Sequence, residues 1–182
     1  PKGVPLSIEV LENRAAIRRE LWLKHGTFVS LFDIGSLGGF GTFHGQLISG
    51  DPYVPPATPS INARNILKRS IEHIQGSPNQ ISALADIVQQ HEYKLDSLKL
   101  VTVAGSAMTP FMMRKIQKIL HSRVQNLYAS TEGGVVSFRT EESEDPQDLG
   151  TILSHVSVQI VDETDSPLNF EAVGRIRVKS SE

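Results

Sequence analysis

The stretch LKLVTVAGSAMTPFMMRKIQKILHSRVQNLY, residues 98–128, decides the fold class. Its first seven residues are almost continuously apolar, as in a strand that is covered on both faces. Thr109 and Pro110 are a typical helix cap and first helical residue, and apolar side chains then recur at helical spacing. A second apolar run, 124–128, predicts another strand. A strand, a helix and a strand at this spacing predict a right-handed βαβ unit with a parallel sheet.

The residues before this unit also alternate between helix and strand patterns. Apolar side chains at helical spacing predict a helix over 8–24, and 28–32 has the pattern of a strand. A glycine-rich stretch and a proline-rich loop fill 35–59, where no element is assigned. Two amphipathic helices are predicted next, one from Thr58 to about Arg69 and one around 81–88.

The last part of the chain has a different pattern. From about residue 150, apolar and polar side chains alternate in two runs, around 156–161 and 176–178, which predicts antiparallel strands. The acidic run 141–145 is the expected boundary. The sequence therefore predicts an α/β fold with a mostly parallel sheet flanked by helices in residues 1–145, followed by an antiparallel β segment in 146–182.

Composition excludes several classes of function. The 182 residues carry a net charge of −2, so no basic excess indicates a nucleic-acid partner. The absence of cysteine excludes disulfides, thiolate zinc sites and a cysteine nucleophile, and it fits a cytoplasmic location. The sequence has no uninterrupted apolar run of transmembrane length and no P-loop motif. The triplet Gly39–Gly41 begins a GxGxxG pattern, but His44 occupies the third glycine position, which favours helix packing over nucleotide binding.

Two loops at the ends of predicted parallel strands contain residues suited to binding a ligand. In 126–134, NLYASTEGG, the Tyr128 ring can stack on a flat base, Thr131 can donate to a phosphate oxygen, and Glu132 is a hard oxygen ligand suited to Mg²⁺. The small residues 105–107, GSA, admit the edge of a planar ligand. Each loop alone also fits an ordinary turn. Because parallel strands place such loops at one crevice, the pair together predicts a binding site.

The residues of the first loop carry a family resemblance. YASTE, residues 128–132, resembles the YGxTE signature of the adenylate-forming enzymes, which include acyl-CoA synthetases, nonribosomal peptide synthetase adenylation domains and luciferases. PKGVPLS, residues 1–7, resembles the end of the phosphate loop of that family, TSGTTGxPKGVxLS. Residues 95–110 and 150–178 resemble two further family segments. All four matches follow the order of the family.

Two positions depart from the family pattern, and two parts of the family lie outside the chain. Ala129 replaces the usual glycine, and Arg175 stands where a glutamate is common. The resemblance implies that the hydroxyl-rich half of the phosphate loop would precede Pro1. It also implies that a ribose-binding aspartate and a catalytic lysine would follow Glu182. The chain is therefore expected to be the middle of such an enzyme.

The resemblance implies chemistry and assigns roles to residues. The expected reaction joins a carboxylic acid and ATP, with Mg²⁺, into an acyl-adenylate, and the acyl group then passes to coenzyme A or to the phosphopantetheine of a carrier protein. Thr131 and Glu132 would be the catalytic residues, and Glu132 would hold the metal. Nucleotide binding is implied for Lys2, Gly105, Ser106, Ala107, Asn126, Tyr128, Ala129, Ser130 and Thr131. Substrate binding is implied for Asp33, Gly133 and Gly134.

The choice of acid depends on Asp33. An aspartate in the segment LFDIG, residues 31–35, resembles amino-acid-activating members, in which the carboxylate pairs with the substrate ammonium. The same aspartate also fits a helix cap, and the surrounding phenylalanines suit an apolar acyl pocket equally well. The leading hypothesis is an acyl-CoA synthetase-like ligase, and the alternative is an amino-acid-activating adenylation domain. A noncatalytic α/β scaffold, a third hypothesis, has no need of Tyr128, Thr131 and Glu132 together.

Overall fold

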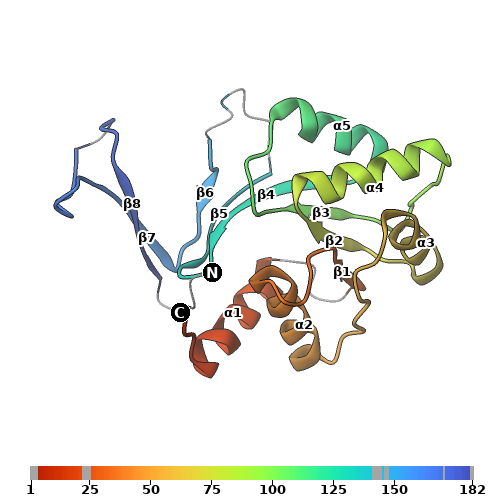
Figure 1. Cartoon of the computed structure of the whole chain (residues 1–182), viewed down its shortest axis with the longest axis horizontal. Coiled ribbons are helices and arrows are strands. Elements are labelled where there is room, and N and C mark those ends of the chain that lie inside the picture. Colours follow the sequence, from red (N-terminus) through yellow and green to blue (C-terminus); the bar gives the residue numbers. More distant parts are fainter. Residues whose placement is uncertain (1–3, 22–25, 141–144, 146–147, 170, 181–182) are drawn as a thin grey trace.

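The computed structural model describes residues 4–21, 26–140, 145, 148–169 and 171–180, and Figure 1 shows its arrangement. Five helices and eight strands are defined within these residues. In chain order they are α1 (Ile8–Leu21), β1 (Phe28–Ser30), α2 (Leu37–Ser49), α3 (Pro59–Arg69), β2 (His73–Gly76), α4 (Pro78–Gln90), β3 (Leu100–Val103), α5 (Pro110–Leu120), β4 (Arg123–Ser130), β5 (Gly134–Arg139), β6 (Thr151–Ile152), β7 (Val156–Val161) and β8 (Arg175–Ser180).

Six strands form the main sheet in the order β1-β2-β3-β4-β5-β6. The first four strands are parallel, and β5 and β6 continue the sheet antiparallel. The β3–α5–β4 unit has the predicted parallel pairing, with Val103 opposite Asn126. The predicted fold class, a mostly parallel sheet flanked by helices and followed by an antiparallel segment, is confirmed.

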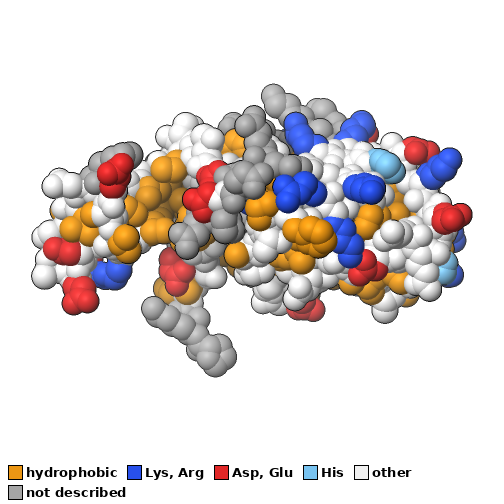
Figure 2. Space-filling view, turned by 90° about the horizontal axis from the view of Figure 1, so that it is seen from above, with side chains coloured by type: hydrophobic (Ala, Val, Ile, Leu, Met, Phe, Trp, Pro, Cys, Tyr) orange, Lys and Arg blue, Asp and Glu red, His pale blue; other side chains and the backbone are white. Residues whose placement is uncertain are grey.

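Helices cover both faces of this sheet (Figure 1). Helices α3, α4 and α5 lie on one face, where fully buried side chains such as Ile66, Leu84 and Ile116 pack with Val101 and Val124 from the strands. Helices α1 and α2 pack against each other on the opposite side. The outer surface of the α4 and α5 layer carries lysine and arginine side chains between scattered apolar ones (Figure 2). In the described ranges, no helix is long and apolar enough to cross a membrane.

The end of the chain forms a separate two-stranded antiparallel ribbon, β7–β8. It joins the main body through a second apolar cluster, in which Leu153 and Val156 pack with Leu127 and Val135. The main sheet continues to Ile152, and the change to the ribbon follows it. The division of the chain at residue 145 stays a prediction, and most of the acidic run proposed as its boundary lies outside the described residues.

The glycine-rich stretch contains a helix that the sequence analysis did not assign. The Ser36 side chain caps the start of α2 by accepting from Gly39 N at 3.1 Å, and Gly50 ends the helix with a positive φ of 70°. The glycines allow close packing. A Cβ on Gly39 would lie 2.0 Å from the Asp33 carbonyl oxygen, and one on Gly41 would lie 1.7 Å from Arg18 Nη1. Tertiary packing therefore outweighs the low helix propensity of glycine.

Three strands also lie outside the predicted elements, among them the two-residue strand β6. Strand β2 has four residues and only one large apolar side chain, Ile74, so its hydrophobic signal is weak. Strand β5 follows Gly133 directly, where only a loop was expected. The predicted helix over 8–24 is confirmed as far as Leu21, and its last three residues lie outside the described ranges.

Candidate active site

The site is built where β3 ends and β4 continues past it. Val103 is the last residue of β3 and pairs with Asn126 in the middle of β4. Two residues beyond this pair come Gly105, in the turn after β3, and Tyr128, which is still within β4. The two predicted loops therefore begin at the same edge of the sheet, as carboxyl ends of parallel strands do. Beyond this point, β4 pairs only with β5, and the register shifts between Tyr128 and Ala129.

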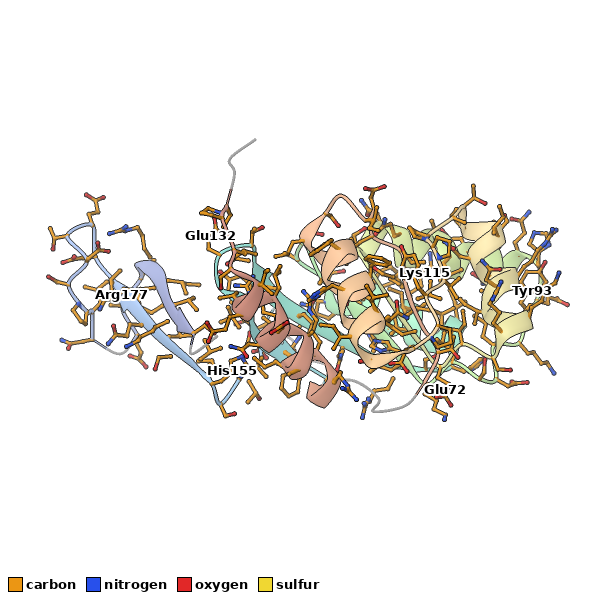
Figure 3. All side chains as sticks on the ribbon, turned by 90° about the horizontal axis from the view of Figure 1, so that it is seen from below. Glu72, Tyr93, Lys115, Glu132, His155 and Arg177 are labelled. Atoms are coloured by element: carbon orange, nitrogen blue, oxygen red, sulfur yellow. The ribbon has the colours of Figure 1, made fainter. Side chains whose placement is uncertain are left out.

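The turn between β4 and β5 presents the two predicted catalytic side chains to solvent. Thr131 and Glu132 are both exposed, and Figure 3 shows Glu132 at this turn, beside the start of α1. The Ser130 hydroxyl accepts a hydrogen bond from Gly133 N at 2.9 Å, which closes the turn. Gly134 has a φ of 66°, a conformation that favours glycine. In the described part of the chain, the Glu132 carboxylate has no hydrogen-bond or ion-pair partner.

A buried arginine from α1 holds this turn from the outside. Arg14 is 5% exposed, and its Nη1 donates to the Thr131 carbonyl at 3.0 Å while its Nη2 donates to the Glu132 carbonyl at 2.8 Å. Arg14 is not among the site residues predicted from the sequence. The available signal was its position, because Arg14 falls four residues after Val10 and three before Ile17, on the apolar side of the helix. A charged side chain in an apolar stripe indicates a specific buried partner.

A groove of about 490 Å³ lies between α1, the β4–β5 turn and β8. Four of the predicted site residues line it: Tyr128, Ser130, Glu132 and Gly133. Arg14 and Val10 form its α1 side, and apolar side chains of β8 complete it. The turn at 105–107 does not line this groove, so the structure brings the two predicted loops to one edge without joining them in one cavity.

The turn after β3 instead contacts the loop after β1. Gly105 has a φ of 89°, and a Cβ there would lie 3.8 Å from the Phe32 ring. All three residues of the turn are exposed. Met108, the next residue, is buried, and its carbonyl accepts a long hydrogen bond of 3.5 Å from Arg139 Nη2. The predicted adenine-binding turn and the predicted acid-binding segment around Phe32 are therefore neighbours.

Asn126 contributes an unsatisfied polar atom at this edge. Its Oδ1 is buried and has no hydrogen-bond partner in the described residues. Arg139 lies opposite Asn126 in the β4–β5 register and is 4% exposed, and its buried Nε likewise has no partner there. An unmatched acceptor and an unmatched donor on neighbouring strands are rare in folded proteins, and they are typical of functional sites and of places where water binds.

Asp33 lies at the carboxyl end of β1 and is exposed. Its Oδ1 accepts from Gly35 N at 2.7 Å, and its carbonyl accepts from Ser36 N and Ser36 Oγ. Ser36, rather than Asp33, is the cap of α2, so the helix-cap interpretation of Asp33 is wrong. In the described part of the chain, Asp33 Oδ2 has no hydrogen-bond partner. The ammonium-binding role stays a prediction.

Residues 1–182 match the sequence profile of the family described as AMP-binding enzyme. The chain belongs to this family. A 4-chlorobenzoate–CoA ligase from Pseudomonas sp. (strain CBS-3) is 23% identical over 141 residues, which are 72% of the chain and 26% of the ligase. Both observations confirm the predicted resemblance to adenylate-forming enzymes.

Solved structures of other proteins share this fold. A variant of the amide bond synthetase McbA from Marinactinospora thermotolerans superposes with a TM-score of 0.86 at 22% identity, over 99% of this chain and 38% of the synthetase. The structure named McyG A-PCP complexed with phenylalanyl-adenylate has a TM-score of 0.79 at 16% identity, over 99% of this chain and 37% of that one. The chain thus spans between 26% and 38% of the length of these three proteins.

The donor set of this AMP-binding chain fits a magnesium nucleotide. The described residues contain no group of three or more metal-ligating side chains, so Glu132 would be a single protein ligand. Mg²⁺ fits such a place because it is usually held by one or two carboxylates together with substrate phosphates and water. The exposed Thr131 hydroxyl is a suitable donor to a phosphate oxygen. Lys2, which was also assigned to the nucleotide, lies outside the described residues.

Proposed function

We propose that this chain is the central part of an enzyme that activates a carboxylic acid with ATP and transfers the acyl group to the thiol of coenzyme A. In the first step, a carboxylate oxygen attacks the α-phosphorus of ATP. A new oxygen–phosphorus bond forms, the bond to the bridging oxygen breaks, and pyrophosphate leaves with the electron pair. In the second step, a thiolate attacks the acyl carbonyl carbon, and AMP leaves.

The residues of this chain would act mainly by positioning charge. The Thr131 hydroxyl donates to a phosphate oxygen, and the Glu132 carboxylate holds Mg²⁺, which would neutralise negative charge on the phosphates. Tyr128, which lines the groove, and the turn at 105–107, which lies outside it at the same edge of the sheet, would contact the adenine from two sides. Because phosphoryl transfer depends on placement and on charge stabilisation, the rigidity of the β4–β5 turn matters as much as its side chains.

One observation carries this proposal. The exposed Thr131 and Glu132 lie on a turn whose backbone is fixed internally by Ser130 and externally by Arg14, at the edge where parallel strands end. A scaffold without catalysis has no use for a hydroxyl and a carboxylate without a partner in the described part of the chain on a turn that is held from both sides. Membership of the AMP-binding family supports the same interpretation.

The test is carboxylate-dependent exchange of pyrophosphate into ATP by the full-length protein, with a panel of fatty, aryl and amino acids. We expect exchange with at least one acid and a fall of about a hundredfold in Glu132→Gln, because the metal ligand is lost. Glu163→Gln, an exposed acid in the β7–β8 turn, is the matched control and should leave the rate unchanged. Equal rates in the two variants, or no exchange with any acid, would contradict the proposal.

A second candidate is activation of an amino acid for a carrier protein. It is favoured by Asp33 Oδ2, which has no hydrogen-bond partner among the described residues and belongs to an exposed side chain just after β1, next to Phe32. A carboxylate at this place attracts a substrate ammonium. Exchange with amino acids that disappears in Asp33→Ala would support this candidate. Exchange with fatty or aryl acids that survives in Asp33→Ala would support activation of those acids instead.

A further inference from the structure

The loop that carries Thr131 and Glu132 depends on a contact from α1. Both carbonyls of this dipeptide accept from one guanidinium, which is almost completely buried. Hydrogen bonds from a charged donor are stronger than those between neutral groups. The rigid fork of arginine suits two carbonyls of consecutive residues, whereas a lysine has a single nitrogen on a flexible stem.

The same helix begins directly after the segment that resembles a phosphate loop. Ser7 ends that segment and starts α1, with its hydroxyl accepting from Val10 N at 3.2 Å and its carbonyl accepting from Leu11 N. Two turns further along, Arg14 reaches the β4–β5 turn. The first two turns of α1 therefore connect two segments that lie more than a hundred residues apart in the sequence.

We infer that Arg14 is a positioning residue, which fixes the backbone of Thr131 and Glu132 so that their side chains meet the phosphates and Mg²⁺ of the bound nucleotide. This inference rests on the proposed function. Arg14 acts through the turn and does not need to touch the substrate. Arg14 itself lines the groove together with Glu132, so its positive charge would lie next to the negative phosphates of a nucleotide bound there.

The structure supplies a matched control for this inference. Gln46 is also 5% exposed, and its Nε2 donates to two backbone carbonyls, Phe28 O at 2.8 Å and Pro52 O at 2.9 Å, away from the β4–β5 turn. Arg14→Met and Gln46→Met each remove a buried side chain that holds two carbonyls. Both variants should lose thermal stability, but only one should disturb the nucleotide site.

The experiment measures pyrophosphate exchange by the full-length protein as a function of Mg²⁺ concentration. Loss of folded protein lowers the rate without changing the Mg²⁺ concentration at the half-maximal rate. We expect that concentration to rise about tenfold or more in Arg14→Met, because misplacing a positioned group by about 1 Å has effects of this size. It should stay at the wild-type value in Gln46→Met. Arg14→Lys, which keeps the charge but carries its donors on a single nitrogen, should show an intermediate shift and remains testable if Arg14→Met does not fold.

Each outcome has a separate meaning. A shift in Arg14→Met or Arg14→Lys that Gln46→Met does not share supports the positioning role. The same half-maximal Mg²⁺ concentration in all variants overturns the inference and leaves the proposed function standing. No exchange by the wild-type protein overturns the proposed function, and the inference with it.

Discussion

The two faces of the main sheet are buried by different chemistry. Toward α3, α4 and α5, the strands present aliphatic side chains such as Ile74, Val101 and Val124, all fully buried. Toward α1 and α2, the alternate positions of the same strands include Thr102 and Gln125, which are buried as well. The first face is stabilised by the removal of apolar surface from water, and the second combines apolar contacts, such as those of Leu100, with buried hydrogen bonds.

A short chain of side-chain hydrogen bonds crosses the polar face. Gln125 Nε2 donates to Thr102 Oγ1 at 2.8 Å, and His73 Nε2 lies 2.7 Å from the same oxygen. The threonine hydroxyl can therefore accept from the amide and donate to a neutral imidazole. Burial, reinforced by the charge of Arg123, lowers the pKa of His73 to about 3. One sheet can therefore contribute stability that does not depend on pH through its apolar face and stability that does depend on pH through its polar face.

The largest expected effect lies on the apolar face. Ile116→Ala removes a side chain of α5 that has no exposed surface, and we expect the free energy of unfolding to fall by about 3 kcal/mol through lost transfer energy and the cavity left behind. Phe111→Ala on the same helix removes a side chain that is 72% exposed, and it should change stability by less than about 0.5 kcal/mol. Urea denaturation of both variants checks this difference, and similar losses would contradict it.

The next effect, acid sensitivity, belongs to the polar face. Because the pKa of His73 falls from 6.5 in the unfolded chain to about 3 in the fold, the unfolded state binds the extra proton first as the pH drops. The stability that the neutral His73 contributes is therefore complete well above pH 6.5, and it is lost as the pH falls from 6.5 toward 3. Between about pH 7.5 and about pH 5 this histidine should account for a loss of about 2 kcal/mol.

The measurement is the free energy of unfolding against pH for the wild type and for His73→Gln. The substitution keeps a possible donor to Thr102 but removes the titration, so its profile should be flatter by the contribution of this residue. His121→Asn is the control, because His121 is exposed and has a positive φ that asparagine tolerates. A profile for His73→Gln that is as steep as the wild type would show that other groups cause the acid sensitivity.

Thr102→Val tests the hydrogen bonds on the polar face directly. Valine has nearly the same shape, but it leaves the Gln125 amide and the His73 ring nitrogen without their shared partner. We expect a loss of about 1–2 kcal/mol in the free energy of unfolding, the usual penalty for buried groups left unsatisfied. Thr102→Ser keeps the hydroxyl and should lose less. A valine variant as stable as the wild type would mean that the polar face tolerates apolar replacement.

The comparison of faces also explains what the sequence could predict. The β3–α5–β4 unit was predictable because its strands are apolar and its helix has a Thr–Pro start. Strand β2 was not, because His73 and Gln75 place polar side chains at alternate positions of a four-residue strand. Helix α2 was missed because its glycines lower helix propensity, and only Ser36 and Gly50 at its ends indicate its limits.

Some features of the candidate site could also be predicted from the sequence, and others could not. The positions of Tyr128, Thr131 and Glu132 at a strand end follow from the sequence, because a local motif carries them. The contact of Arg14 with this turn could not be predicted, because it joins residues 117 and 118 positions apart and involves backbone carbonyls that leave no trace in the sequence. The buried Asn126 Oδ1 and Arg139 Nε, which lack a partner among the described residues, likewise depend on the register of β4 and β5.

The smallest expected effect concerns the outer surface of the helices that cover the apolar face. Lys115 Nζ lies 2.7 Å from Asp86 Oδ1, and the two side chains are 36% and 58% exposed. Water and salt screen such a pair, so its coupling energy should be below about 0.5 kcal/mol. Unfolding of Lys115→Gln, Asp86→Asn and the double variant forms a cycle that isolates the interaction from the loss of each side chain. A coupling energy above about 1 kcal/mol would show that surface charge also holds α4 and α5 together, and the contrast with the polar face would then weaken.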